Sequence, residues 1–270
     1  MNITFIGGGN MATAIIGGLL QRGWRADQLR VVEIVAAARD KLEQTYGVKV
    51  FADINAEALQ ADGVVLAIKP QQMREVAALL APHIGAALVI SIAAGIRGGD
   101  LSRWLGNHQR IVRVMPNTPA LVLAGISGLY AMLGVSADDR KRAEDILGAV
   151  GETLWVAREE DIDTVTAVSG SGPAYVFYFI EALTEAAREL GMSAAAARQL
   201  AIGTFSGASK LAAQSSADAA ILRQRVTAKG GTTERALAAM ETDQVKAAIV
   251  RAVKAAAQRS RELGDELGRG

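Results

Sequence analysis

The stretch Asn2-Ile-Thr-Phe-Ile-Gly-Gly-Gly-Asn-Met-Ala-Thr-Ala14 determines the fold of the first half of the chain. Its first apolar residues, Ile3, Phe5 and Ile6, predict a short buried strand, and glycines 7–9 predict a tight turn. From Asn10 onward the apolar residues change to helical spacing. These helical residues are Met11, Ile15, Ile16, Leu19 and Leu20. A strand, a glycine turn and a helix in this order predict a dinucleotide site.

The glycine turn has the pattern G-x-G-x-x-A, with Gly7, Gly9 and Ala12 in its small positions. The first permits the turn, the second lets the backbone approach a pyrophosphate, and the third lets helix and strand pack closely. Backbone N–H groups at the helix start and the helix dipole favour an anion there. The alternative is an ordinary glycine-rich turn without a ligand. The expected cofactor-binding residues are Gly7, Gly8, Gly9, Asn10, Met11 and Ala12.

Composition excludes several classes of function. The chain has 270 residues, of which 50% are hydrophobic, so it is long enough for one large or two modest domains. Its net charge of +1 lacks the excess of basic residues that is typical of nucleic-acid-binding proteins. The absence of cysteine excludes a disulfide framework and thiolate catalysis, and two histidines, His83 and His108, cannot form a histidine-rich metal cluster. We expect no metal, and we expect both histidines on the surface or in loops.

No signal peptide precedes the first predicted strand, so we expect a cytoplasmic enzyme. Residues 76–96 contain no charged side chain and imitate a membrane span. The sequence Pro82-His83-Ile84-Gly85 interrupts this run. A helix that ends before a buried strand over 87–93 explains the pattern better than a span.

Alternating strand and helix patterns up to about residue 157 predict a doubly wound α/β domain with a mainly parallel sheet. Two polar or proline-containing loops, Lys69-Pro70 and Pro116–Pro119, follow predicted strands, which is where such a sheet binds its ligand. Further strands are expected at 31–35, 48–50, 63–68, 87–93, 111–115, 128–132 and 153–156. Helices are expected at 56–60, 71–80 and 138–150.

Two polar residues are candidates for contact with the adenosine half of the cofactor. Glu33 lies in the second predicted strand, 24 residues after Gly9, near where an acid can bind the ribose 2′-hydroxyl. A carboxylate there favours NADH over NADPH, although Arg39 is near enough in sequence to reach a 2′-phosphate. The alternative is that Glu33 is a solvated strand end. Asn55 is expected to cap the helix that follows it and to face the adenosine.

The chain from 158 to 270 is predicted to be an all-helical domain, separate from the dinucleotide-binding domain 1–157. Its segment Tyr175–Ile180 is apolar nearly all round a helix, so that helix should be buried on every side. Five helices of mixed length are too few to bury it, and we therefore expect an obligate homodimer. The helices are expected near 173–190, 194–214, 217–228, 233–241 and 244–267.

Two further stretches combine small residues with a helix start. Residues 164–175, TVTAVSGSGPAY, expose N–H groups and hydroxyls together before an apolar helix. Residues 226–237, VTAKGGTTERAL, form a second helix N-terminus suited to an anion, here a substrate carboxylate. The alternatives are a small-residue packing turn for the first stretch and a capped helix without a ligand for the second.

Taken together, these motifs resemble those of the pyrroline-5-carboxylate reductase family, over essentially the whole chain. The resemblance implies reduction of 1-pyrroline-5-carboxylate to L-proline with NADPH or NADH, the last step of proline biosynthesis. It also implies a Rossmann domain followed by an α-helical dimerisation domain that intertwines with its partner, so that each active site takes residues from both subunits. The matching stretches are Gly7–Met11, Ala67–Gln71, Ser91–Gly95, Arg113–Pro119, Val168–Tyr175 and Val226–Thr233.

The resemblance also implies roles for individual residues. Thr166 would contact the ring nitrogen of the substrate, and the glycine turn that begins at Gly230 would bind the substrate carboxylate. Two departures stand out: the family often has Ser-Pro where this chain has Ala228-Lys229, and Glu33 places an acid near the 2′-phosphate pocket. The implied cofactor residues are those of the first glycine turn with Asn55, Ala67, Lys69 and Pro70. The implied carboxylate-binding residues are Gly230, Gly231, Thr232 and Thr233.

The expected reaction needs little side-chain acid–base chemistry, because a protonated cyclic imine is already electrophilic and the protein mainly positions it. One alternative is a hydroxyacid dehydrogenase, which would need a general acid or base such as Lys or His. Neither residue occurs between Leu154 and Ser209. Another alternative is a non-catalytic dinucleotide sensor, but such a protein would not need the second anion site at 226–233.

Overall fold

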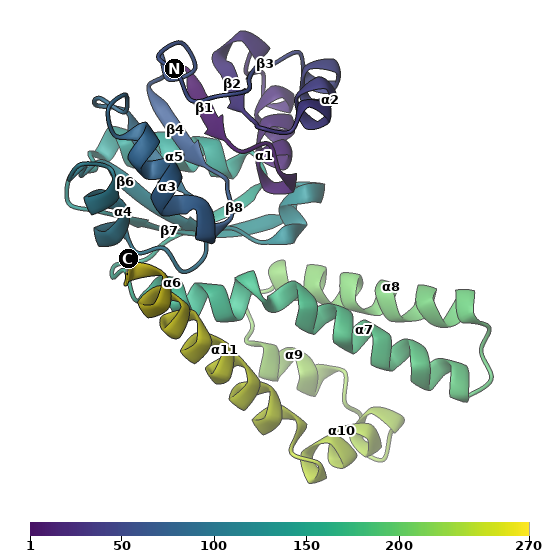
Figure 1. Cartoon of the computed structure of the whole chain (residues 1–270). Helices are drawn as coiled ribbons and strands as arrows, with labels where there is room; N and C mark the ends of the chain where they lie inside the picture. The colour runs from purple at the N-terminus through teal and green to yellow at the C-terminus, as the bar shows by residue number, and fades with distance from the viewer. Residues whose placement is uncertain (270) are drawn as a thin grey trace. The chain divides into compact units, whose positions relative to one another are not determined.

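The structure is a computed structural model that describes residues 1–269 (Figure 1). Contacts within the chain divide it into two compact units. The first comprises Met1–Ser171 together with the chain from Ala256, and the second comprises Gly172–Ala255. The helix α11 (Val245–Gly268) therefore contributes to both units.

The first unit is built on a single eight-stranded sheet with the strand order β3-β2-β1-β4-β5-β6-β7-β8. All neighbouring strands are parallel except β6 and β7, which are antiparallel. The predicted doubly wound, mainly parallel sheet is therefore confirmed. The strands are β1 (Ile3–Ile6), β2 (Leu29–Val32), β3 (Lys49–Phe51), β4 (Gly63–Leu66), β5 (Leu88–Ser91), β6 (Ile111–Met115), β7 (Gly125–Ala131) and β8 (Gly151–Trp155).

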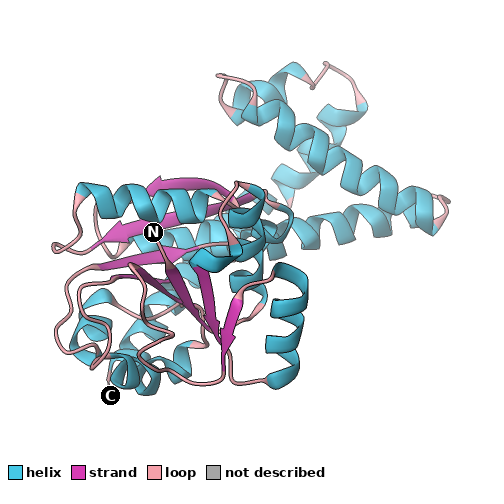
Figure 2. Cartoon of the chain, turned by 90° about the horizontal axis from the view of Figure 1, so that it is seen from above, coloured by secondary structure: helices cyan, strands magenta, loops and turns pink. Residues whose placement is uncertain are grey.

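Helices cover both faces of this sheet (Figure 2). Side chains alternate along β1, so that Ile3 and Phe5 belong to one apolar core and Ile6 to another. The first core includes α1 (Asn10–Gln21), α2 (Ala36–Tyr46) and α5 (Ala137–Gly148), and the second includes α3 (Met73–Leu80) and α4 (Gly98–Trp104). The predicted apolar face of α1 lies in the first core, with Ile15, Ile16 and Leu19 fully buried.

Short helical segments complete the first unit. Three are 3₁₀ turns, and α6 (Asp161–Val165) runs directly into a π-helical segment, η4 (Thr166–Gly170). Single-turn π segments inside helices are rare and are frequent at functional sites. The 3₁₀ turns are η1 (Ala26–Gln28), η2 (Pro70–Gln72) and η3 (Thr118–Val122).

The second unit is entirely helical. Its longest helices, α7 (Gly172–Glu189) and α8 (Ala194–Ala213), lie side by side (Figure 1), with the rings of Phe179 and Phe205 centred 6.3 Å apart. No residue of α7 is buried in the single chain, and Phe177 and Tyr178 are 64% and 70% exposed. The other helices are α9 (Ala219–Arg225), α10 (Thr232–Thr242) and the start of α11.

Two local predictions are wrong, and one helix was missed. The second strand ends at Val32, not Val35, because β3 is short and Glu33 makes the last ladder bond, from its N–H to the Phe51 carbonyl at 2.9 Å. The predicted helix 56–60 is only a turn. Asn55 caps it as expected, with its Oδ1 accepting the Ala58 N–H at 2.9 Å, but the chain must enter β4 a few residues later. The helix α4 was not predicted at all.

The apolar run 76–96 forms α3, a loop and β5, as its sequence predicted. Among residues 1–269, no helix combines the length and the hydropathy that crossing a membrane requires.

Candidate functional site

The loops after β1 and β4 meet where the strand order changes direction. From β1 the chain adds β2 and β3 on one side and then returns to add β4 on the other. Such a point in an open α/β sheet is where ligands bind, at the carboxyl ends of the strands. Gly7 has φ of +96°, and a Cβ on it would lie 2.6 Å from the Ala67 carbonyl oxygen. Only glycine therefore allows these two loops to touch.

The remaining small positions of the turn serve helix α1. A Cβ built on Gly9 would have nothing within 4 Å, so the backbone there is open to a ligand, whereas Ala12 is 1% exposed and packs in the core. Gly9 is the N-cap and no side chain caps the helix. The first intrahelical bond runs from the Thr13 N–H to the Gly9 carbonyl, so the N–H groups of residues 10–12 point out of the helix end. This arrangement suits an anion.

Glu33 lies beside this turn and is held there by the backbone. Its Oε2 accepts the Gly8 N–H at 2.8 Å, and its Oε1 accepts the Val35 N–H at 2.9 Å. Arg39 donates through Nη1 to the carbonyl oxygens of Glu33 and Ile34, at 2.7 and 2.9 Å. The carboxylate thus has a fixed place at the end of β2, and the guanidinium is engaged with carbonyls.

The other predicted cofactor residues follow β3 and β4, so they lie at the same edge of the sheet. The Ala67 N–H continues the sheet by donating to the Ile6 carbonyl at 2.8 Å. Lys69 is exposed and is the N-cap of η2, which begins at Pro70. Asn55 caps the turn after β3. The structure therefore brings together the first glycine turn, Glu33 and these loops.

Thr166 belongs to the same compact unit, at the start of the π segment. Its Oγ1 donates to the Ile162 carbonyl at 2.8 Å, and the Ser171 N–H donates to its carbonyl, also at 2.8 Å. The hydroxyl proton is thereby used inside the helix, while the oxygen keeps lone pairs that can accept a hydrogen bond. The segment packs onto the end of β6, where a Cβ on Gly170 would lie 2.4 Å from Met115 Cε.

The predicted carboxylate-binding residues lie in the second unit, at the N-terminus of α10. Gly230 has φ of +74°, and its N–H donates to Glu234 Oε2 at 2.6 Å. The Gly231 N–H donates to the Ala228 carbonyl at 3.0 Å, which closes the turn. Gly231 is the N-cap and no side chain caps the helix. The first intrahelical bond runs from the Arg235 N–H to the Gly231 carbonyl, so the outward N–H groups are those of Thr232, Thr233 and Glu234.

Two polar groups in the first unit were missed by sequence reasoning. Arg113 is 6% exposed and forms a 2.6 Å ion pair with Glu159, whose same oxygen accepts the Gly98 N–H at 2.5 Å. Asn117 is 9% exposed and bridges β7 to the π segment. The sequence signal for Asn117 was its position between Pro116 and Pro119. Those prolines predicted a loop after the strand, but they did not predict the contact of Asn117 with Ser169.

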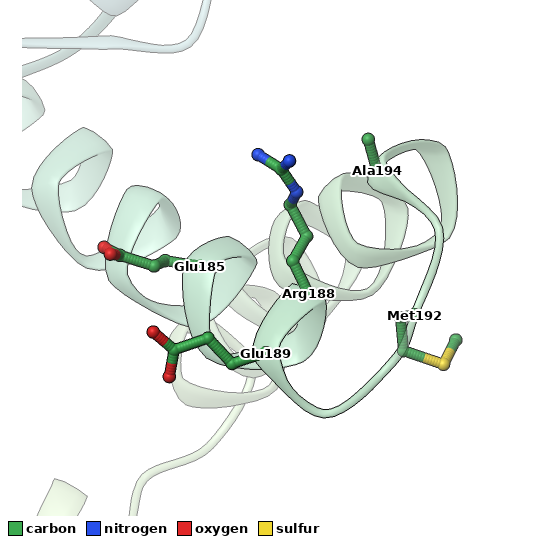
Figure 3. Close-up of a pocket in the computed structure, with 5 residues that line it drawn as sticks. All are labelled: Glu185, Arg188, Glu189, Met192 and Ala194. Carbon is green, nitrogen blue, oxygen red and sulfur yellow. The ribbon is translucent and has the colours of Figure 1, made fainter.

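A hollow in the second unit has a different character. It lies at the connection between α7 and α8. Figure 3 shows the carboxylates of Glu185 and Glu189 projecting to one side of α7 and the guanidinium of Arg188 to another. None of the predicted site residues lines it. Over residues 1–269, no three His, Cys, Asp or Glu side chains gather as metal ligands would.

Comparison with known proteins assigns both parts of the chain. Residues 159–263 match the family model for the pyrroline-5-carboxylate reductase dimerisation domain. Residues 2–95 match the model described as NADP oxidoreductase, coenzyme F420-dependent.

Full-length relatives extend this result. The chain is 46% identical to a pyrroline-5-carboxylate reductase of Pseudomonas aeruginosa over 268 residues, which is 98% of each chain. A reductase of the same name from Pasteurella multocida is 41% identical over 97% of each chain. This chain belongs to the pyrroline-5-carboxylate reductase family. The resemblance noted in the sequence is thus confirmed.

Solved structures of the family agree with the fold. The reductase from Coxiella burnetii superposes with a TM-score of 0.92 at 42% identity, covering 97% of this chain and 98% of that one. The Plasmodium falciparum reductase, solved with NADP bound, superposes with a TM-score of 0.87 at 29% identity, covering 98% of each chain. A Rossmann domain followed by a helical dimerisation domain is therefore confirmed. Family membership also favours a reductase that uses NADPH or NADH over the dehydrogenase and sensor alternatives.

Proposed function

We propose that the protein reduces 1-pyrroline-5-carboxylate to L-proline with NADPH or NADH, as the last step of proline biosynthesis. The observation that carries this proposal is the match to reductases of that name over nearly the whole chain. Two helix ends without side-chain caps, at α1 and α10, supply the two anion sites that a dinucleotide and a small carboxylate require.

In this proposal the first unit binds the cofactor. The N–H groups at the start of α1, beside Gly9, bind the pyrophosphate, because no side chain occupies them and the space beside Gly9 is open. Asn55 and the loop Ala67–Pro70 contact the rest of the dinucleotide along the same sheet edge. The bound cofactor supplies the hydride. The carboxylate of Glu33, fixed by two backbone N–H groups, binds the ribose 2′-hydroxyl and so favours NADH over NADPH.

The substrate carboxylate is bound by the second unit. Gly230 and Gly231 shape the turn, and their own N–H groups bond within it. The N–H groups of Thr232 and Thr233 are therefore the ones proposed to receive the carboxylate. The helix dipole of α10 adds to this attraction.

Thr166 is the proposed catalytic residue, and its hydrogen bonding suggests how it acts. Its hydroxyl proton is directed to the Ile162 carbonyl, so toward a substrate the oxygen is an acceptor. A protonated cyclic imine carries an N–H and no free lone pair on nitrogen. Thr166 would therefore accept the N–H of the protonated imine and hold the electrophilic form in place, without itself transferring a proton.

We also propose that residues 1–157 form the dinucleotide-binding domain and residues 158–270 the dimerisation and substrate-binding domain of an obligate homodimer. The ranges of the two family models support this division. The large apolar side chains exposed on α7 support the dimer, since such side chains gathered on one helix are typical of a protein interface. We place the enzyme in the cytoplasm, in keeping with a biosynthetic role, and cell fractionation tests that location.

The activity itself is tested by following nicotinamide absorbance with the purified protein. Oxidation of NADPH or NADH that depends on pyrroline-5-carboxylate and yields proline would support the proposal. Reduction of NAD by a hydroxyacid, with no activity on the imine, would favour the dehydrogenase alternative. Cofactor binding without turnover of either substrate would favour the sensor.

A further inference from the structure

The carbonyl of Ser169 cannot find its usual partner in its own helix. In an α-helix each carbonyl accepts the N–H of the residue four positions later, and for Ser169 that residue is Pro173. Proline has no N–H. A carbonyl that lacks its α-helical donor is stabilised by a donor from another part of the chain.

Asn117 supplies that donor from the loop after β6. Its Nδ2 lies 3.3 Å from the Ser169 carbonyl oxygen and 3.5 Å from Ser169 Oγ. Its Oδ1 accepts the Ile126 N–H at 3.0 Å, from the adjacent strand β7. A backbone N–H can only donate, so the amide oxygen must face Ile126 and the amide nitrogen must face Ser169. Both ends of this 9% exposed side chain are therefore committed.

The loop that carries Asn117 is itself stiff and closely packed. Pro116 and Pro119 restrict its backbone, and Pro119 lies in the first turn of η3. The residue just before the loop, Met115, packs directly against the backbone of Gly170. The exit from β6 thus holds the π segment at two neighbouring points, Ser169 and Gly170.

Thr166 is the first residue of this same segment, and the widened turn is closed by the bond from the Ser171 N–H to the Thr166 carbonyl. The Thr166 side chain bonds back to the Ile162 carbonyl, so it lies where α6 passes into this widened turn. We propose that Asn117 is a positioning residue of the reductase, which by holding the Ser169 carbonyl keeps Thr166 Oγ1 directed at the ring nitrogen of the substrate. This inference rests on the function proposed above and adds a residue to it.

Two substitutions of Asn117 distinguish the effect of losing its hydrogen bond to Ser169 from the effect of losing the volume of its side chain. Asn117→Asp keeps the size and the acceptor for Ile126 but turns a carboxylate oxygen toward the Ser169 carbonyl, and Asn117→Ala removes both bonds. We expect each to lower kcat/KM for pyrroline-5-carboxylate by about tenfold, because small displacements of a positioning group are costly in rate. The Kd for NADPH or NADH should stay within about twofold of wild type, since neither end of the amide is open to the cofactor.

Ser136→Ala is the matched control for stability. Ser136 caps α5 by accepting the Asp139 N–H at 3.1 Å. This helix follows β7, which runs antiparallel to β6, so Ser136 lies at the end of the sheet opposite to Met115 and Thr166. The control should lower Tm while leaving kcat/KM unchanged. Equal losses of activity in the control and in both Asn117 variants would overturn the proposal.

A double-mutant cycle with Thr166→Val tests whether Asn117 acts through Thr166. If it does, adding Asn117→Ala to Thr166→Val should lower kcat/KM by less than about twofold, because the positioned group is already gone. A full additional tenfold loss would overturn the inference. Hydrogen exchange gives a readout without substrate: the Ser171 amide should exchange faster in Asn117→Ala, and unchanged exchange would also count against the proposal. If wild type itself fails to reduce the imine, the proposed function fails and the exchange result still judges the role of Asn117 in the turn.

Discussion

The carboxylate of Glu33 accepts the Gly8 N–H at 2.8 Å, which joins the end of β2 to the glycine turn after β1. Its other oxygen is held by the Val35 N–H, so the charge cannot easily swing away. A 2′-phosphate placed in this region would meet a fixed negative charge. We expect Glu33→Ser to shift the ratio of kcat/KM values toward NADPH by about tenfold, since removing one like charge nearby is worth about 1–2 kcal/mol. Parallel steady-state kinetics with both cofactors measure this ratio.

Glu33→Gln and Glu43→Ser are the controls for this prediction. Glu33→Gln keeps the shape without the charge and should produce a similar shift. Glu43 is exposed on α2, and its substitution should leave the ratio unchanged. If neither Glu33 variant changes the preference, Glu33 is simply a solvated strand end that braces the turn.

Thr166→Val tests the proposed contact with the ring nitrogen. Valine has nearly the same shape but no acceptor oxygen, so we expect kcat/KM to fall by about thirtyfold, which corresponds to about 2 kcal/mol. The Kd for NADPH or NADH should be unaffected. Thr166→Ser keeps the hydroxyl and should retain most of the activity. An unchanged kcat/KM in Thr166→Val would remove this residue from the mechanism.

The parts of the fold that sequence could predict are those determined by local pattern. The strand over Ile3–Ile6, the glycine turn and the start of α1 at Asn10 are encoded in consecutive residues, and the structure has them as predicted. The same is true of the helices of the second unit, whose observed bounds differ from the predicted ones by only a few residues. Helical periodicity is a strong local signal over such lengths.

The parts that could not be predicted depend on contacts between distant segments. The second strand ends early because its neighbour β3 ends at Phe51, and nothing within residues 31–35 encodes that limit. Asn117 meets Ser169 across 52 positions of sequence. The π-helical form of the segment at Thr166 was likewise hidden, since Pro173 marks a helix start but does not say which side chain will replace its missing N–H.

The exposed apolar face of α7 leads to a prediction about assembly. Phe177 is 64% exposed in the single chain, and a charge placed there would have to be buried in the proposed dimer. We expect Phe177→Glu to abolish the dimer and the activity together. Light scattering gives the mass and a kinetic assay gives the activity.

Leu133→Glu is the matched control for the dimer. Leu133 is fully exposed in the loop after β7, so the same new charge there should leave mass and activity as in wild type. A wild-type chain that is a stable, folded and active monomer would refute the obligate dimer. A Phe177→Glu protein that remains dimeric would move the interface away from this face of α7.

The buried carboxylate of Asp139 predicts how stability depends on pH. Asp139 is 1% exposed, and it pairs with Arg110 at 2.8 Å and accepts the Ser136 N–H at 3.3 Å. Burial alone would raise the pKa of Asp139, but the hydrogen bonds from Arg110 and Ser136 outweigh it and lower the pKa below its ordinary value. A carboxyl whose pKa is lower in the folded state stabilises the fold above its ordinary pKa, and this contribution is lost as pH falls through the folded value.

We therefore expect Asp139→Asn to lower the free energy of unfolding at neutral pH by about 2 kcal/mol, the scale of a charged hydrogen bond. Denaturant unfolding of both proteins from neutral to acidic pH should show the difference shrinking as the wild-type carboxylate becomes protonated. Asp138→Asn controls for the charge in the first turn of α5, because Asp138 is exposed in that same turn, and it should have little effect. If the difference between wild type and Asp139→Asn stays constant as pH falls, the loss arises from altered packing around Arg110 and not from the ionised carboxylate.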